Sequence, residues 1–183
     1  MRITRLKIGK AKSHFEFLKW KTFFLLLMLT FFSCSYDKGE TVSLSDAALL
    51  DLIKSPAGYT YYKNNTDTLL SDPSSPHDRY ARIRFNSIAA AAMNNDLSNL
   101  GGSRFPDGSI IVKELYPRSG GNLSLWAAMF KTSVDNNTGG GWVWGEYRLN
   151  GDILFSTSQK GVGCISCHSA AGNVDLVRTF SLH

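Results

Sequence analysis

The sequence lacks a hydrophobic run long enough to span a membrane, and beyond its first residues it lacks an excess of positive charge. Its main apolar run, TFFLLLMLTFF at residues 22–32, has eleven residues, whereas a transmembrane helix needs roughly 20. Residues 1–33 carry seven Lys and Arg against one acid, and the remainder carries 13 against 14. The formal net charge of +5 therefore belongs to the leader, and it gives no support for nucleic-acid binding.

This basic and then apolar leader has the pattern of an export signal. The run ends in FFSC at Cys34, and a small residue before a cysteine at this place resembles a bacterial lipoprotein signal, in which the cysteine is lipidated. The alternative is an ordinary signal peptide with Cys34 as a stray thiol. We expect a signal peptide at 1–33, a polar tether at 34–42 and one domain at 43–183, exported, periplasm-facing and anchored to a membrane.

The domain has the pattern of an α+β fold with a small antiparallel sheet and flanking helices. We expect residues 57–79 to be mostly loop with one strand, and Gly- and Asn-rich turns to separate the later strands. We expect helices at 43–56 and 86–97 and strands at 80–85, 109–116, 123–133, 141–149 and 152–156. The cysteine segment at the C-terminal end should lie against this sheet.

Cysteine and histidine are scarce, and this limits what the segment GCISCHSAAGNVD, residues 163–175, can bind. A redox dithiol would open a helix within a βαβ unit, and no such alternation is present. A zinc site needs two more ligands, but outside the leader only two other histidines remain. Two thiols three positions apart can form thioethers to the vinyl groups of haem, with the next residue under the iron. The sequence therefore predicts one covalently bound haem c, held by Cys164 and Cys167, with His168 as axial iron ligand.

The sixth position of the iron decides what such a haem does. An electron-transfer cytochrome fills it with Met or His, and the candidates are Met93, Met129, His77 and His183. Each methionine fits a core position, and His77 lies in a polar loop. The C-terminal place of the motif also differs from that of a small helical electron carrier. We expect an open site and keep a six-coordinate electron-transfer cytochrome as the alternative.

The strand SIIVKELY places a charge on each of its faces. Alternation puts Lys113 beside Ile111 and Leu115, and Glu114 on the opposite face. One interpretation is an edge strand with a charge at the rim. In the other, Lys113 is buried against the haem, which lowers the pKa of its amine and makes it nucleophilic.

The phrases ARIRFNSIAAAAM, FPDGSIIVKELY, GWVWGEY and CISCHSAAGNVDLVRT together resemble the cytochrome P-460 family. Its members include hydroxylamine-oxidising cytochromes with a haem–lysine crosslink and lysine-lacking, gas-binding cytochromes c′-beta. The resemblance implies a homodimer and a haem open on one side. It matches Lys113 to the crosslinking lysine and Arg84 to a distal-pocket arginine. Cys164, Cys167 and His168 match the haem anchors and the proximal ligand.

One departure from that family concerns proton transfer. The hydroxylamine-oxidising members hold a pocket glutamate, and its position here falls on Ala127, in a stretch without any carboxylate from Gly120 to Thr132. A base within hydrogen-bond reach is the natural means of removing the substrate's protons. We therefore expect tight binding of nitric oxide and feeble oxidation of hydroxylamine, with a cytochrome or another acceptor as redox partner.

Overall fold

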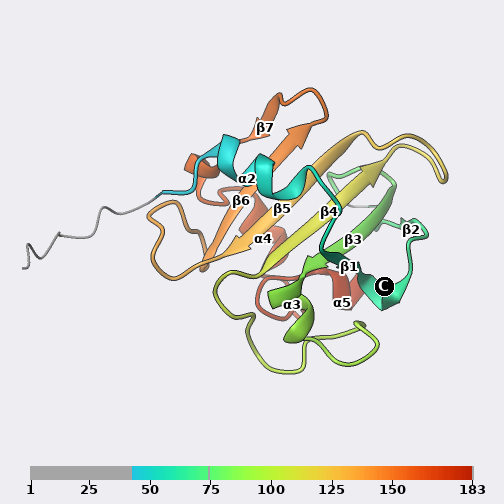
Figure 1. Cartoon of the computed structure of the whole chain (residues 1–183), viewed down its shortest axis with the longest axis horizontal. Helices are drawn as coiled ribbons and strands as arrows, with labels where there is room; N and C mark the ends of the chain where they lie inside the picture. The colour runs from blue at the N-terminus through green and yellow to red at the C-terminus, as the bar shows by residue number, and fades with distance from the viewer. Residues whose placement is uncertain (1–42, 74, 183) are drawn as a thin grey trace, which may run out of the picture. The chain divides into compact units, whose positions relative to one another are not determined.

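The computed structural model describes residues 43–73 and 75–182, and it builds them around one antiparallel sheet (Figure 1). The strands are β1 (Tyr59–Tyr61), β2 (Leu69–Leu70), β3 (Tyr80–Asn86), β4 (Ile110–Tyr116), β5 (Leu125–Lys131), β6 (Trp142–Arg148) and β7 (Ile153–Phe155). The helices are α2 (Asp46–Ile53), η2 (Tyr62–Asn64), α3 (Ser87–Ala91), η3 (Thr157–Gln159), α4 (Cys164–His168) and α5 (Thr179–Leu182).

The sheet is a meander with one irregular edge. Its order is β1-β3-β4-β5-β6-β7, and β2 also pairs with β3. Every pairing is antiparallel, and β3 to β7 follow one another in the chain. The predicted α+β fold is confirmed, and all five strands predicted between residues 80 and 156 lie within about two residues of their expected bounds at each end.

The helix expected at 86–97 is much shorter than its sequence suggested. Asn86 caps α3 by accepting a hydrogen bond from the Ala89 N–H at 3.0 Å, but the helix already ends at Ala91. The side chain of Asn94 accepts the N–H groups of Ser98 and Asn99 instead. Asparagine side chains compete with the helical hydrogen bonds in this way, and they turn the chain into a loop.

The two faces of the sheet bury different cores. One core, on the face toward the C-terminal segment, contains Ile83, Phe85, Ile111, Leu115, Met129, Trp142, Trp144 and Val177. The other, under α2, contains Leu49, Ile53, Ile110, Val112, Trp126, Val143 and Tyr147. In Figure 1, α2 lies over the near face and the C-terminal segment, in red, lies behind the strands. The sheet therefore separates two layers that share no side chains.

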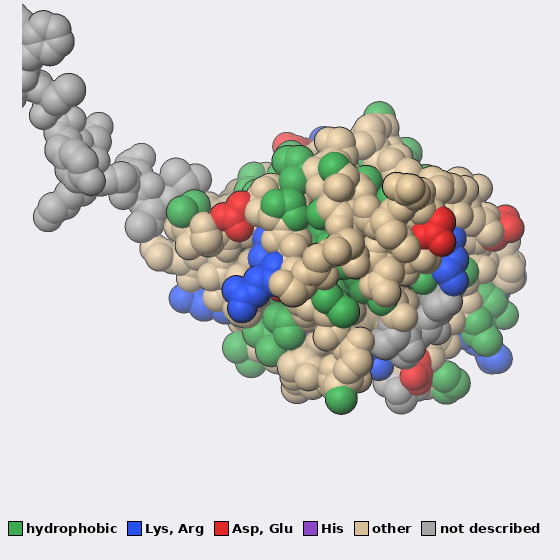
Figure 2. Space-filling view, turned by 90° about the horizontal axis from the view of Figure 1, so that it is seen from below, with side chains coloured by type: hydrophobic (Ala, Val, Ile, Leu, Met, Phe, Trp, Pro, Cys, Tyr) green, Lys and Arg blue, Asp and Glu red, His purple; other side chains and the backbone are tan. Residues whose placement is uncertain are grey.

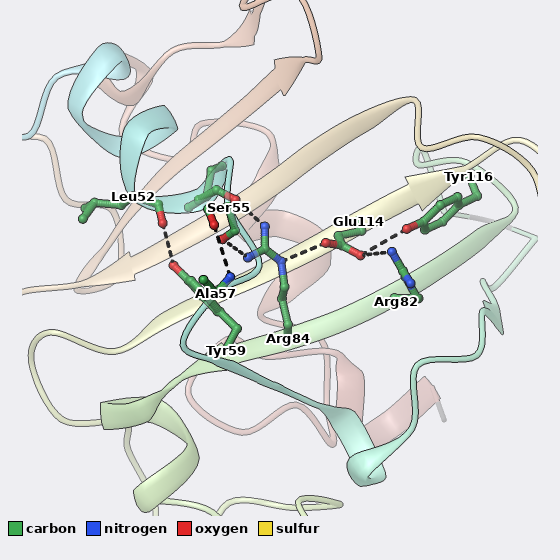
Figure 3. Close-up of polar contacts among 9 residues, drawn as sticks. Leu52, Ser55, Ala57, Tyr59, Arg82, Arg84, Glu114 and Tyr116 are labelled. Carbon is green, nitrogen blue, oxygen red and sulfur yellow. Dashed lines mark hydrogen bonds and ion pairs between the residues drawn. The ribbon is translucent and has the colours of Figure 1, made fainter.

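A buried ion network fixes α2 to the sheet (Figure 3). The guanidinium of Arg84 donates to the carbonyls of Ser55, at 2.7 Å, and Ile53 at the C-terminal end of α2. Its Nε lies 2.9 Å from a carboxylate oxygen of Glu114, whose other oxygen pairs with Arg82 at 2.8 Å. Arg84 also stacks over the ring of Tyr59 at 4.4 Å. Arg84 thus neutralises a buried carboxylate and satisfies helix-end carbonyls.

Arg84 lies away from the haem cavity, so its predicted role as a residue of the haem pocket is wrong. Its β3 neighbour Ile83 packs in the core on the C-terminal face, and consecutive strand residues point to opposite faces. Arg84 is fully buried on the α2 face. Its contribution is to the stability of the fold.

The surface of the described chain is chemically mixed. On the face in Figure 2, acidic and basic side chains lie in small groups with hydrophobic side chains between them. Among the described residues, no helix is both long enough and apolar enough to cross a membrane. Residues 1–42, including Cys34 and the predicted leader, lie outside the described part of the chain.

The Arg84 network predicts a large loss of stability without a change at the pocket. Arg84→Met should lower the free energy of unfolding by about 3 kcal/mol, because it leaves the buried Glu114 carboxylate with only the partly exposed Arg82 as its ion-pair partner, beside the Tyr116 hydroxyl. The matched control is Lys54→Met, which breaks an exposed pair with Asp51 and should cost under about 1 kcal/mol. Urea unfolding followed by circular dichroism measures both. A changed haem absorption spectrum in folded Arg84→Met would instead place this residue at the pocket.

Candidate functional site

One cavity of about 310 Å³ lies between the sheet and the C-terminal segment. Its floor contains one cross-strand row, formed by Ile83, Lys113, Ala127, Glu146 and Phe155. The residues are aligned because each strand pairs directly with the next, and residues that are paired across strands point to the same face of the sheet. The opposite wall holds the cysteine segment, so residues more than 80 positions apart in sequence share one cavity.

The two cysteines lie on α4, a helix of little more than one turn. The residue before it, Gly163, has φ 91°, a conformation that glycine adopts without strain. Cys164 and Cys167 are three positions apart and therefore share one side of the helix, and both line the cavity. Burial raises the pKa of the Cys164 thiol to about 11, with Glu146 adding to the effect, so in this state the sulfur is a neutral thiol.

The imidazole of His168 is held in one tautomer. Its Nδ1 lies 2.7 Å from the carbonyl oxygen of Leu176, and since a carbonyl only accepts, Nδ1 carries the hydrogen. The ring of Trp144 meets the imidazole edge to face at 4.9 Å between centroids. Burial lowers the pKa of His168 to about 4, so the ring is neutral at pH 7. Nε2 is then the lone-pair nitrogen that can bind a metal.

Lys113 lies on the cavity floor, as the burial interpretation of its strand predicts. Burial and the nearby charge of Arg178 lower the pKa of its amine and Glu146 opposes them, so that the pKa is about 8. Near pH 8 a substantial share of this amine is neutral and nucleophilic. The alternative interpretation, a charge at the rim of an edge strand, is wrong, because β4 lies inside the sheet between β3 and β5.

Glu146 supplies the pocket carboxylate that the sequence analysis expected to be absent. Ala127 does face the cavity, as expected, and Glu146 is its direct partner on β6. The carboxylate lies 3.2 Å from Nδ1 of His77, and both side chains are partly exposed, at 26% and 20%. The expectation of a pocket without a base is therefore wrong. Strand alternation places Glu146 on the same face as Trp144, but only the pairing of β5 with β6 brings it to Ala127.

The candidate sixth ligands have different positions. Met129 and His77 line the cavity, whereas Met93 packs in the core beside α3. His183 lies outside the described residues. Arg178 lines the cavity, and sequence analysis did not single it out because its segment has no regular period.

The arrangement suits a covalently attached planar macrocycle. Two thiols stand on one side of a helix, a neutral imidazole nitrogen follows them, and most of the cavity wall is apolar, including Ile83, Ile111 and Val177. Thiols at this spacing form thioethers with haem vinyl groups, and the imidazole binds the iron. The site is therefore that of a c-type cytochrome, and the sequence contains one such motif.

Comparison with known families agrees with this class. The model of the cytochrome P460 family matches residues 56–179, so the chain belongs to that family. This confirms the predicted resemblance and the covalently bound c-type haem. No curated protein sequence matches the chain significantly.

Proposed function

We propose that this cytochrome oxidises hydroxylamine or a similarly small nitrogen compound and passes the electrons to an acceptor protein. The observation that carries the proposal is Glu146, a carboxylate on the floor of the haem cavity beside Ala127. Oxidation of an N–H or O–H compound releases protons with each electron, and a nearby base speeds that release. Binding of nitric oxide alone would need no such group.

The residues around the cavity have separate roles in this reaction. A bound haem would supply an iron that can bind a small nitrogen compound and accept its electrons. His168 would hold that iron through Nε2, because its Nδ1 is engaged by the Leu176 carbonyl. Glu146 accepts the substrate's proton, and the small side chain of Ala127 leaves space beside it for a ligand of a few atoms.

His77 can transfer the proton that Glu146 has accepted to solvent. Its Nδ1 faces the Glu146 carboxylate at 3.2 Å, and its ring is partly exposed. A neutral imidazole accepts a proton at one nitrogen and releases another from the second nitrogen. We infer that Glu146 and His77 act in series, with His77 returning the carboxylate to its ionised form between turnovers.

Lys113 is proposed to form a crosslink to the ring edge. Its partly neutral amine lies in the same row as Glu146, two strands away. The reaction replaces an N–H bond and a ring C–H bond by a C–N bond. Two protons are released, and two electrons pass to an oxidant of the peroxide class.

A six-coordinate electron-transfer cytochrome is the second candidate, since Met129 and His77 both line the cavity. His77 already pairs with Glu146, which favours the open site. The optical spectrum of the reduced protein separates the two. A low-spin spectrum with a thioether-to-iron band would contradict the proposed function.

We further propose that the protein is exported, lipid-anchored and a homodimer. The leader at 1–33 and the cysteine that follows it support the first two statements, and the family resemblance supports the third. Light scattering of the purified protein measures the oligomeric state, and a mass of one chain would contradict the dimer.

Glu146→Gln should lower kcat for hydroxylamine oxidation by about 10²-fold or more, because a neutral amide cannot accept the proton. The assay uses an artificial one-electron acceptor, and nitric-oxide affinity serves as the second readout. That affinity should stay near wild type, since binding moves no proton. Asp152→Asn, which removes an exposed carboxylate outside the cavity, is the matched control. Wild-type kcat in a fully loaded Glu146→Gln protein would show that another group takes the proton.

Lys113 should form its crosslink faster at pH 9 than at pH 7. The folded-state pKa of about 8 means that the amine is mostly protonated below this value and mostly neutral above it. The measurement is the yield of a proteolytic haem peptide containing both Lys113 and CISCH after peroxide treatment. Lys113→Leu should give an ordinary c-type spectrum, and Lys160→Leu, an exposed lysine outside the cavity, is the control. Recovery of a haem-free Lys113 peptide from mature protein would rule out the crosslink.

Cys34→Ala should abolish membrane association. Wild-type protein is expected to partition into the detergent phase, because a lipidated N-terminal cysteine carries it there. Cys34→Ala should be recovered in the aqueous phase or as unprocessed precursor. A wild type that stays aqueous and begins at an unmodified residue other than Cys34 would contradict lipidation.

A further inference from the structure

We propose that Lys131 and Asp175 form a clamp that positions the proximal imidazole and thereby sets the electron-donor strength of the axial ligand. The segment 173–177 supplies the carbonyl that binds Nδ1 of His168, and the clamp determines where this carbonyl lies. Neither residue lines the haem cavity, so both act through the backbone.

The backbone at the carbonyl is unusual. Asp175 and Leu176 both have positive φ, 50° and 65°. A leucine rarely adopts this conformation, because its Cβ crowds the backbone. Such a pair persists only where the surrounding structure imposes it. The contacts of Asp175 therefore stabilise the turn that places the Leu176 carbonyl under the imidazole.

Those contacts come from three separate parts of the fold. Lys131, at the end of β5, donates to Asp175 Oδ1 at 2.8 Å, and the two side chains are only 10% and 7% exposed. The N–H of Phe105 donates to the other carboxylate oxygen at 2.8 Å. The indole N–H of Trp142 donates to the Asp175 carbonyl at 2.9 Å. The carboxylate and its own peptide are thus both fixed, immediately before Leu176.

The electronic consequence follows from the hydrogen bond. A proximal imidazole that donates its Nδ1–H to a well-placed acceptor is a more basic ligand at Nε2. A more basic ligand strengthens the iron–imidazole bond and favours the oxidised iron. If Asp175 loses Lys131, only the contacts from Phe105 and Trp142 remain, so the Leu176 carbonyl shifts and this donation weakens. The clamp therefore lowers the reduction potential of the bound haem.

The decisive variant is Asp175→Asn. Asparagine tolerates positive φ and keeps the shape of the side chain, so the substitution removes the charge that Lys131 binds and leaves the backbone conformation accessible. In mature, haem-loaded protein we expect a lower iron–histidine stretching frequency by resonance Raman spectroscopy and a more positive reduction potential. Lys131→Met should give the same shifts, and Lys131→Arg should restore wild-type values by keeping the ion pair.

A second buried ion pair provides the control. Arg84→Met removes a buried cation on the opposite face of the sheet, so it destabilises the fold without touching the clamp. It should leave the stretching frequency and the potential unchanged. Wild-type values of both in haem-loaded Asp175→Asn and Lys131→Met would overturn the proposal, and so would equal shifts in Arg84→Met. Because neither readout involves hydroxylamine, this outcome is independent of the proposed function.

Discussion

The pairing register of β3 to β7 is the constraint on which the site depends. It brings a lysine, an alanine and a glutamate from three strands into one row on one face. A slip of one residue in any strand would turn its member of the row to the opposite face. The buried aromatic residues on the same face, Trp142 and Trp144, resist such a slip, because the slip would move them out of their own core and into the different core under α2. The packing of the core therefore maintains the chemistry of the cavity.

The row also explains how a base can be present although the expected position holds alanine. Neighbouring strands lie about 4.8 Å apart, so a carboxylate on β6 reaches nearly the same space as one on β5. A glutamate placed at Ala127 would stand directly opposite Glu146, where like charges repel. The two positions are alternative places for one carboxylate in the cavity, and this chain has it at the second.

The haem attachment site could be predicted from the sequence because its functional residues are close together in the chain. Two thiols and an imidazole within five residues need no knowledge of the fold. The position of Lys113 could be predicted only in part. Strand alternation shows which residues share its face, but only the place of β4 inside the sheet shows that Lys113 is buried.

The remaining features depend on contacts between distant segments. Glu146 lies 33 positions from Lys113, and no local pattern connects them. The family resemblance matched Arg84 to the haem pocket, and strand alternation could not test this match, because alternation gives two faces but does not say which one meets the haem. The clamp between Lys131 and Asp175 needs a turn of positive φ that nothing in the letters NVDLV indicates.

The charged network around Arg84 has an implication for how this protein can change. It secures α2 to one side of the sheet, while the haem chemistry takes place on the other side. Substitutions on the cavity floor therefore leave untouched the contacts that hold α2 in place. The side chains at Ala127, Lys113 and Glu146 can therefore be exchanged without removing any of the ionic contacts between α2 and the sheet.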